Sequence, residues 1–460
     1  MTEIPNRILR EYDIRGTVGK NLDEAIAYQV GRRFAICTQA ESKGPVVVGR
    51  DGRLSSQKLA DAVIAGIRVR GSDVIDIGVG PTPMLYFAVQ QLEGAAGGIM
   101  VTGSHNPPED NGFKMTLKTR PFFGSDIQNM AQLNVPAIGS QMGQLSQQDL
   151  RDEYANRILD TITDKPVQSL QIAWDPGHGA AADIVRLLTA KGAMPAEHIL
   201  LNCEIDGTFP AHHPDPTVPA NLQQLIEVVR DQKCDLGIAF DGDGDRLGVV
   251  DGHGRIIWGD QLLTLLSRDV LSRNPGATII ADVKASQTLF DDIASRGGNP
   301  IMWRTGHSLI KSKIYETGAM LAGEMSGHIF FNDEYYGYDD GLYAAVRLIR
   351  ILMASKKSLV ELYDALPTLV NTPEMRIECS DDEKFKVVEA ITADLKKTKA
   401  DLVDVDGVRV HTNKGWWLIR ASNTQAALVA RAEAADQKSL DVLVREIREY
   451  LKKHGITANI

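Results

Sequence analysis

The fold class is decided by residues 45–71, PVVVGRDGRLSSQKLADAVIAGIRVRG, which join a short apolar strand to a polar loop and an amphipathic helix. The same plan recurs in LQIAWDPGHGAAADIVRLLTAKG (170–192) and in ATIIADVKASQTLFDDIASRGG (277–298). Alternating strands and helices are typical of mixed or parallel sheets covered by helices. We therefore predict an α/β fold with three consecutive related mixed α/β domains.

Residues 368–460 follow a different plan, which predicts a smaller α+β domain. SDDEKFKVVEAITADLKK (380–397) predicts a helix, DGVRVHTNKGWWLIRASNT (406–424) two strands, and SLDVLVREIREYLKKHG (439–455) a second helix that starts at Ser439. The first helix is expected to place four apolar side chains on one face: Phe385, Val388, Ile391 and Leu395. With a length of 460 residues, the chain divides into domains at 1–150, 151–253, 254–367 and 368–460.

Composition excludes several classes of protein. A hydrophobic content of 43% and a charged content of 24% are typical of globular chains. A net charge of −10 argues against a nucleic-acid partner. No apolar run has the roughly 18–20 residues of a membrane span, and the first residues lack a signal-peptide core, so we expect no membrane partner and a cytoplasmic protein. The four cysteines are far apart and indicate neither a disulfide framework nor a zinc site.

The strongest chemical signal is FDGDGDRLG (240–248), where Asp241, Asp243 and Asp245 alternate with glycines after an apolar run. Side chains at alternate positions of an extended segment share one side, so three carboxylates can converge on one cation. Carboxylate oxygens with room for water and phosphate suit Mg²⁺. An EF-hand is excluded because Arg246 and Gly252 stand where that loop needs a glycine and an acid.

Ser104 in VTGSHNPPEDNGFKM (101–115) is the candidate nucleophile. For a lone serine, a turn cap is the favoured explanation. His105 and Lys114 are nearby groups that can move protons, but no G-x-S-x-G elbow and no Walker-type phosphate loop is present. The local residues leave the choice between turn cap and nucleophile open.

Three further loops carry polar side chains suited to a phosphorylated sugar. AGEMSGHIFF (322–331) alternates hydroxyl-binding groups, RTGHSLIKSK (304–313) offers a histidine after a glycine, and IRASNTQ (419–425) offers an arginine fork beside small polar residues. Each segment also has a structural explanation. Residues 322–331 can be a polar strand edge, His307 can be a structural histidine, and residues 419–425 can be an ordinary turn. The candidate residues are Glu324, Ser326, His328, His307, Arg420, Ser422, Asn423 and Thr424.

Four motifs in this order, TGSHNPPEDNGFK, DGDGDR, GEMSGH and RASNT, resemble the α-D-phosphohexomutase superfamily, most closely its bacterial phosphomannomutase/phosphoglucomutase branch. EYDIRG near the start and HHPDP at 212–216 extend the resemblance over essentially the whole chain. It implies four domains around a central active-site cleft. It also implies reversible transfer of a phosphoryl group between hexose 1-phosphate and hexose 6-phosphate of mannose or glucose, through phosphoserine at Ser104 and a hexose 1,6-bisphosphate.

The resemblance also implies roles for single residues. One Mg²⁺ per chain would lie on the three aspartates and on an oxygen of the Ser104 phosphate. The implied groups for proton transfer and charge stabilisation are Lys114, Arg246, His328, Arg15 and His105. The implied substrate contacts are Tyr12, Lys284, His307, Glu324, Ser326, Arg420, Ser422, Asn423, Thr424 and Gln425. Phosphosugars are then the expected partners, with hexose 1,6-bisphosphate as activator, for a chain that is a monomer or alternatively a dimer.

Two departures from the family pattern and two alternative activities remain. Ala426 stands where many relatives have proline, and His178 stands where asparagine is common. A phosphoglucosamine mutase is the alternative within the superfamily, although Met325 occupies the place where those relatives tend to have glutamine. A metal-dependent sugar phosphatase would use similar groups but must admit water, which a mutase must exclude.

Overall fold

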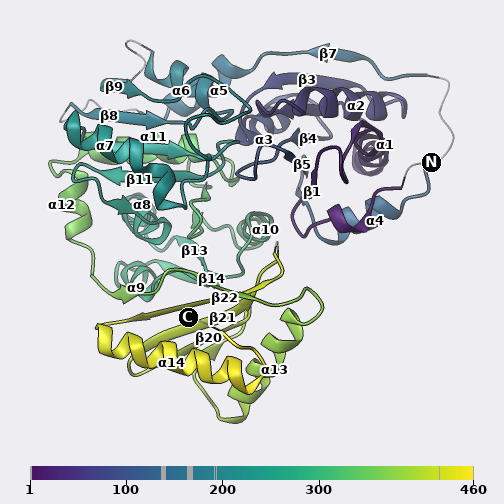
Figure 1. Cartoon of the computed structure of the whole chain (residues 1–460). Coiled ribbons are helices and arrows are strands. Elements are labelled where there is room, and N and C mark those ends of the chain that lie inside the picture. Colours follow the sequence, from purple (N-terminus) through teal and green to yellow (C-terminus); the bar gives the residue numbers. More distant parts are fainter. Residues whose placement is uncertain are drawn as a thin grey trace.

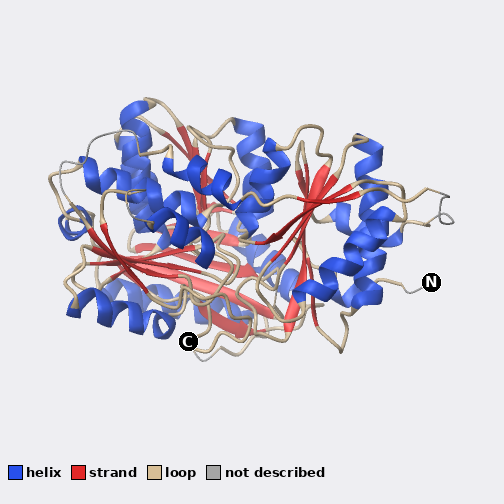
Figure 2. Ribbon diagram, turned by 90° about the horizontal axis from the view of Figure 1, so that it is seen from above, coloured by secondary structure: helices blue, strands red, loops and turns tan. Residues whose placement is uncertain are grey.

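The computed structural model describes residues 3–135, 141–162, 169–190, 192, 194–423, 425–458 and 460. Within these residues the strands form four sheets that follow one another along the chain. Figure 1 shows the purple N-terminal part beside the teal second part, the green third part beneath them, and the yellow C-terminal sheet at the far end. Seen from above, helices flank the twisted sheets (Figure 2).

The first sheet lies in the N-terminal domain. Its strands are β1 (Ile14–Thr17), β2 (Val46–Arg50), β3 (Val74–Val79), β4 (Gly97–Val101), β5 (Asp110–Leu117), β6 (Pro121–Phe122) and β7 (Leu145–Gln147). Its helices are α1 (Glu24–Glu41), α2 (Ser56–Arg68), α3 (Thr82–Gln91) and α4 (Ser125–Gln132), after the short 3₁₀ helix η1 (Asn6–Ile8). Val46 and Val48 join the core with α1 and α2, whereas Val47 joins the core with α3. Helices thus cover both faces of β2, which explains why its first three residues are all valine.

The second sheet is built on the repeated strand at 171–175. Its strands are β8 (Gln171–Asp175), β9 (Glu197–Leu200), β10 (Leu236–Phe240), β11 (Leu247–Asp251) and β12 (Ile256–Ile257). The helices are α5 (Arg151–Leu159), α6 (Ala182–Thr189) and α7 (Gln223–Asp231), with the 3₁₀ helix η2 (Pro219–Leu222). The domain limits stay predictions, and β12, just past the predicted limit at 253, pairs with β11.

The third sheet is the smallest of the three α/β sheets. Its strands are β13 (Thr278–Asp282), β14 (Asn299–Trp303), β15 (Leu321–Gly323) and β16 (Ile329–Phe331). The helices of this part are α8 (Gly259–Arg273), α9 (Gln287–Ser295), α10 (His307–Thr317), α11 (Gly341–Ala354) and α12 (Leu359–Asp364). One continuous apolar core joins it to α3 of the first part and to the second sheet.

The predicted repeat is present as a repeat of topology. The strand orders β3-β2-β4-β5, β9-β8-β10-β11 and β14-β13-β15-β16 are equivalent. In each unit the first three strands are parallel and the fourth is antiparallel. The prediction of three related mixed α/β domains is confirmed.

The fourth sheet carries two helices on one face. Its strands are β17 (Val370–Asn371), β18 (Met375–Glu378), β19 (Leu402–Val403), β20 (Val408–Thr412), β21 (Gly415–Ala421) and β22 (Ala427–Ala434), and its helices are α13 (Lys384–Lys397) and α14 (Gln437–Lys453). Trp417 and Ile419 pack with the helices, whereas Trp416 and Leu418 pack with Val283 of the third part. The alternation of strand side chains thus gives this domain its own core and a face toward the third part.

Two details of this domain differ from the prediction. Phe385 is 49% exposed, because the inner face of α13 begins with Lys384, which donates a hydrogen bond to the carbonyl of Gln425 at 2.9 Å. Helix α14 begins before Ser439, since the Asp436 carboxylate caps it by accepting from the Ser439 N–H at 2.8 Å. Across the described part of the chain, no helix has the length and apolar character needed to cross a bilayer.

Candidate active site

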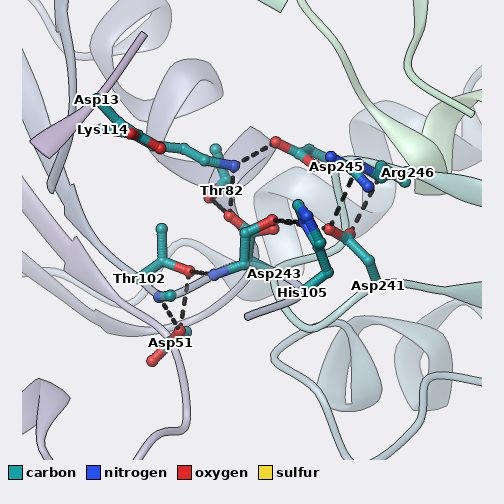
Figure 3. Close-up of polar contacts among 12 residues, drawn as sticks. Asp13, Asp51, Thr82, Thr102, His105, Lys114, Asp241, Asp243, Asp245 and Arg246 are labelled. Carbon is teal, nitrogen blue, oxygen red and sulfur yellow. Dashed lines mark hydrogen bonds and ion pairs between the residues drawn. The ribbon is translucent and has the colours of Figure 1, made fainter. Parts of the chain in front are cut away.

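The predicted chemical loops occupy equivalent places in the repeated units. Ser104 follows β4, the three aspartates follow β10, and Glu324 follows β15, so each loop joins the third strand of its unit to the fourth. Figure 3 shows side chains from the first loop meeting those of the aspartate loop between two differently coloured parts of the chain. The loops touch closely: a Cβ added to Gly242 would lie 2.4 Å from the Ser104 carbonyl oxygen, so this position requires glycine.

Ser104 is held in an uncommon backbone conformation at the start of its loop. Its φ of 49° lies in the left-handed region, which costs free energy for a residue other than glycine and is often found at functional sites. Its hydroxyl donates to Asp241 Oδ2 at 2.9 Å and lies 3.1 Å from His105 Nδ1. Burial lowers the pKa of His105 well below its usual range, so the imidazole is neutral beside the hydroxyl. Ser104 is thus not a surface turn cap.

A buried ion pair shapes the Ser104 loop. The Arg53 guanidinium donates to four carbonyl oxygens, at 2.8 Å to Ser104, 2.6 Å to Asn106, 2.5 Å to Pro107 and 3.1 Å to Asp110. Asp51 accepts from Arg53 and from the N–H of Gly103 at 3.1 Å. The conformation of the loop therefore depends on a side chain from the polar loop after β2.

Replacing Arg53 with methionine should destabilise the chain, because four carbonyls lose their donor while Asp51 stays buried. We expect the free energy of unfolding, measured by urea denaturation, to fall by about 3–5 kcal/mol. The matched control is Arg50→Met, which loses only a 3.6 Å ion pair with Asp76 and should cost less than about 1 kcal/mol. Equal losses in the two variants would contradict this account.

The three aspartates converge, as predicted. Asp241, Asp243 and Asp245 are fully buried, and ligand atoms from each lie within 4.8 Å of one another. Lys114 on β5 bridges two of them, at 2.7 Å to Asp243 and 2.5 Å to Asp245, and Thr82 donates to Asp243 at 2.5 Å.

The pKa values within this cluster are pushed apart. Burial raises the pKa of Asp241 well above its usual range, and the charges of Asp245 and Asp243 raise it further. Burial would also raise the pKa of Asp243, but Lys114 together with hydrogen bonds from Thr82 and Ser104 outweighs burial and holds that pKa at about 2. Burial alone would lower the pKa of Lys114, yet the carboxylates raise it well above its usual range. If all three carboxylates were ionised, their negative charge would exceed the positive charge of Lys114 and Arg246, and this excess adds to the raised pKa of Asp241.

The donor set fits a hard divalent cation. Asp243 Oδ1 and Asp245 Oδ1 are buried and lack a hydrogen-bond partner among the described residues. Buried polar atoms are normally paired, and carboxylate oxygens are the ligands that Mg²⁺ prefers. A cation here would pair these oxygens and offset the excess charge.

Two arginines flank the centre. Arg246, which follows the aspartates, donates from its backbone N–H to Asp241 Oδ1 at 3.2 Å and from its Nε to His328 Nε2 at 3.0 Å. Arg15 on β1 pairs with Asp13 at 2.6 Å and donates to Asn106 Oδ1 at 2.7 Å. Both guanidinium groups therefore border the Ser104 loop or the aspartate loop, as a site for phosphate would need.

The third and fourth parts approach this centre through Tyr12. Its hydroxyl donates to the Thr305 carbonyl at 2.8 Å and accepts from Asn423 Nδ2 at 2.7 Å. Its ring lies edge-on to His307, and His307 stacks on His328 with 5.5 Å between centroids. Residues from the first, third and fourth parts thus meet at one place.

The other predicted substrate contacts lie on the loops of the third and fourth parts. The Glu324 carboxylate accepts from the Gly306 N–H at 2.7 Å, and Lys284 pairs with Glu374 at 2.7 Å. Arg420 at the end of β21 donates to Asp406 at 2.8 Å.

The remaining predicted contacts lie in the loop between β21 and β22 or in the turn between β15 and β16. Ser422 Oγ accepts from the Gln425 N–H at 3.2 Å, and the Gln425 side chain accepts from Arg376 at 2.6 Å. Ser326 is half-buried in the turn between β15 and β16. Thr424 lies outside the described residues.

Several residues of the site were not found by sequence reasoning. Asp13, Arg53 and Asp51 support the Ser104 loop, and Thr82 donates to Asp243 of the aspartate loop. Asp339 lies beside His307 and His328. The only available signals were DGR directly after β2 and two adjacent acids in YDDG (338–341). Neither pattern predicts which residues these side chains contact, because the contacted residues lie far away in the sequence.

Four family models match the chain from end to end. They are the phosphoglucomutase/phosphomannomutase alpha/beta/alpha domains I, II and III, at residues 6–132, 152–254 and 258–370, and the C-terminal domain at 374–450. The three α/β matches and the distinct C-terminal match agree with the four sheets described above.

Relatives match over nearly their whole length. A phosphomannomutase/phosphoglucomutase of Pseudomonas aeruginosa is 44% identical over 451 residues, covering 98% of this chain and 96% of the relative. A phosphoglucomutase of Neisseria meningitidis is 41% identical, covering 99% and 98%. The crystal structure of a phosphoglucomutase/phosphomannomutase family protein from Burkholderia thailandensis superposes with a TM-score of 0.92 at 43% identity, covering 99% of both chains. The chain therefore belongs to the phosphoglucomutase/phosphomannomutase family of the α-D-phosphohexomutase superfamily.

Proposed function

We propose that this enzyme interconverts hexose 1-phosphate and hexose 6-phosphate, of mannose, glucose or both, by reversible phosphoryl transfer through Ser104. The observation that carries the proposal is the 2.9 Å contact between Ser104 Oγ and Asp241, which brings a serine of one domain onto a buried carboxylate cluster of the next. The names of the full-length relatives support the same activity.

In the proposed reaction, phosphoserine 104 donates its phosphoryl group to a free hydroxyl of the sugar phosphate. The bond between phosphorus and Ser104 Oγ breaks, and a bond forms between phosphorus and the sugar oxygen. The sugar hydroxyl loses its proton and Ser104 Oγ gains one. His105, whose Nδ1 lies 3.1 Å from Oγ, and Lys114, whose ammonium pairs with Asp243 and Asp245, are proposed to take part in these proton movements. The bisphosphate then returns its other phosphoryl group by the same route in reverse.

We propose that Asp241, Asp243 and Asp245 hold one Mg²⁺. Bound there, Mg²⁺ would offset the charge of the phosphoryl group during transfer. Two cationic side chains add to this charge stabilisation. Lys114 forms ion pairs with two of the aspartates, and the Arg246 Nε is 4.0 Å from Asp241. Phosphoryl transfer depends mainly on such positioning and charge stabilisation.

The phosphate that is not reacting is proposed to bind the loop of the fourth part, at Arg420, Ser422, Asn423, Thr424 and Gln425. Glu324, Ser326, His307 and Lys284 are proposed to bind the sugar. The hydrogen bond from Asn423 to Tyr12 supports this, since it joins the distal loop to the first part. The hexose 1,6-bisphosphate must reorient within the site so that either phosphate can face Ser104. The proposed sugar and phosphate contacts must therefore accept both orientations.

The activity is tested with glucose 1-phosphate, mannose 1-phosphate and glucosamine 1-phosphate side by side, each with Mg²⁺ and a trace of hexose 1,6-bisphosphate. We expect phosphorus NMR to show conversion of the glucose or mannose compound to its 6-phosphate. Faster conversion of the glucosamine compound would indicate a phosphoglucosamine mutase. Release of inorganic phosphate without isomerisation would indicate a phosphatase and overturn the proposal.

Replacing Arg420 with lysine should raise KM about tenfold and leave kcat within about twofold. Lysine keeps the charge but loses the planar fork that grips phosphate with two hydrogen bonds. Because the distal phosphate is bound equally before and during transfer, the loss falls on KM. Arg445→Lys on the exposed face of α14 is the control and should change neither constant. A fall in kcat with unchanged KM would contradict the assignment of Arg420 to the distal phosphate.

We also propose that the enzyme works as a monomer in the cytoplasm. The candidate site is assembled from loops of a single chain, so no second copy is needed to complete it. Sedimentation at working concentration should give the mass of one chain, and a dimer that dissociates with loss of activity would contradict this.

A further inference from the structure

Asp339, which no part of the proposed reaction uses, lies beside the two stacked histidines of the site. It is fully buried, and its Oδ1 accepts from Lys311 at 2.9 Å. Its Oδ2 lies 3.1 Å from His328 Nδ1 and 3.6 Å from His307 Nδ1. None of these three atoms has a hydrogen-bond partner among the described residues, so Asp339 Oδ2 faces the two imidazole nitrogens at ion-pair distance. The lysine thus fixes one carboxylate oxygen and leaves the other facing two imidazoles.

The contact on the other side of His328 determines which of its nitrogens carries the proton. Arg246 Nε can only donate, and it points at His328 Nε2 from 3.0 Å. His328 Nε2 must therefore be the acceptor, which leaves the proton on Nδ1. The nearest acceptor for that proton is Asp339 Oδ2 at 3.1 Å, ahead of Asp245 Oδ1 at 3.6 Å.

We infer that Asp339 is a positioning residue that holds His328 in its Nδ1–H form and thereby holds Arg246 over the reaction centre. The chain of contacts runs from Lys311 to Asp339, then to His328, and then to Arg246, whose backbone N–H contacts Asp241. His328 in this arrangement has its Nε2 lone pair committed to Arg246. The inference rests on the proposed function and adds to it a role for His328, which in this structure supports Arg246 through Nε2.

The charge state of Asp339 suits this role. Burial would raise the pKa of Asp339, but Lys311, His328 and His307 together outweigh burial and hold that pKa well below its usual range, so the group stays an acceptor. Burial lowers the pKa of His307 well below its usual range, so the stacked neighbour is neutral. A carboxylate beside an imidazole nitrogen selects the tautomer that carries its proton on that nitrogen, as the buried aspartate does in a serine-protease triad.

The test is Asp339→Asn, with Asp340→Asn as the matched control. An asparagine amide can donate to His328 Nδ1 and so favours the Nε2–H form, which opposes the Arg246 N–H. We expect nitrogen-15 NMR of labelled histidine to show the proton of His328 moved from Nδ1 to Nε2. We also expect kcat to fall about 10²-fold with KM changed less than about twofold. Asp339→Glu, which keeps the carboxylate, should retain the Nδ1–H form and recover part of kcat.

Asp340 is the neighbouring buried aspartate with a different role. It caps α11 through the Tyr343 N–H at 2.9 Å and accepts from Tyr154 at 2.8 Å and from Tyr335 at 2.9 Å. Asp340→Asn should lower Tm and leave the His328 tautomer and kcat unchanged. Equal loss of kcat in the two asparagine variants would overturn the inference.

The nitrogen-15 spectrum of the wild-type protein tests the tautomer of His328 even if Asp339→Asn does not fold. An Nε2–H form of His328 in the wild-type protein would overturn the inference without any variant. Failure of the proposed function is separate, since it would appear as a wild-type enzyme that does not interconvert hexose phosphates, whatever the tautomer of His328.

Discussion

Ser104→Ala is expected to abolish interconversion of hexose 1- and 6-phosphates, with a loss of at least about 10⁴-fold in kcat, while the fold stays intact. The variant has no oxygen at the 2.9 Å contact with Asp241 and therefore no atom to carry the phosphoryl group. Because the transferred group is stored on the protein, no neighbouring side chain can substitute for it. The measurement is a coupled assay with added hexose 1,6-bisphosphate, together with mass spectrometry of the phosphopeptide containing residue 104.

The matched control for this prediction is Ser267→Ala. Ser267 is also fully buried, but its hydroxyl donates to the Thr264 carbonyl within α8, away from the site. That variant should keep full activity and the phosphopeptide. Full turnover by Ser104→Ala in the presence of bisphosphate would remove the phosphoserine from the mechanism.

Asp243→Asn is expected to lower Mg²⁺ affinity more than about 10²-fold and kcat about 10³-fold at saturating substrate. Asparagine keeps the shape but removes one charge from the carboxylate cluster, and its amide nitrogen offers no lone pair to a cation. The same charge also holds Lys114, 2.7 Å away, so the ammonium loses one of its two partners. Titration calorimetry with Mg²⁺ measures the affinity, and the interconversion assay measures kcat.

Asp251→Asn controls for the loss of a buried carboxylate in the same sheet. Asp251 ends β11 and pairs with Arg255 at 2.7 Å, away from the cluster. This variant should lose stability and keep its affinity for Mg²⁺. A chelator should stop turnover of the wild-type enzyme until Mg²⁺ is restored. Unchanged activity of Asp243→Asn, or of chelated enzyme, would remove the metal from the aspartates.

Much of the fold was predictable because its signals are local. Strand β2 is apolar on both faces, and the same strand, loop and helix pattern returns at β8 and β13, so the three α/β units followed from the sequence. Phe385 was wrongly placed in the core of the fourth part because a helical stripe that starts at Lys384 fits the spacing of the buried positions equally well. Residue polarity favoured Phe385 over Lys384 for the inner face. Lys384 is nevertheless buried there, because its ammonium donates a hydrogen bond to the Gln425 carbonyl.

The candidate site was predictable where its residues share one short loop. Asp241, Asp243 and Asp245 converge because they alternate after a buried strand, a pattern visible in nine residues. Arg53 and Asp339 could not be found this way. Arg53 reaches carbonyls more than fifty positions away, and Asp339 lies in a segment whose neighbour, Asp340, serves only the fold.

The sequence by itself determined the repeated α/β plan, the order of the four motifs, the carboxylate triplet and the candidate serine, because each is written in contiguous residues. Only the tertiary structure decided that Ser104 is a buried partner of Asp241 and not a turn cap. It also decided that Lys114 bridges two aspartates and that the Arg246 Nε donates to His328 Nε2. These contacts join loops from different domains, and their strength depends on burial and on distances of about 3 Å, which are set by how the domains pack and are not encoded at any one position.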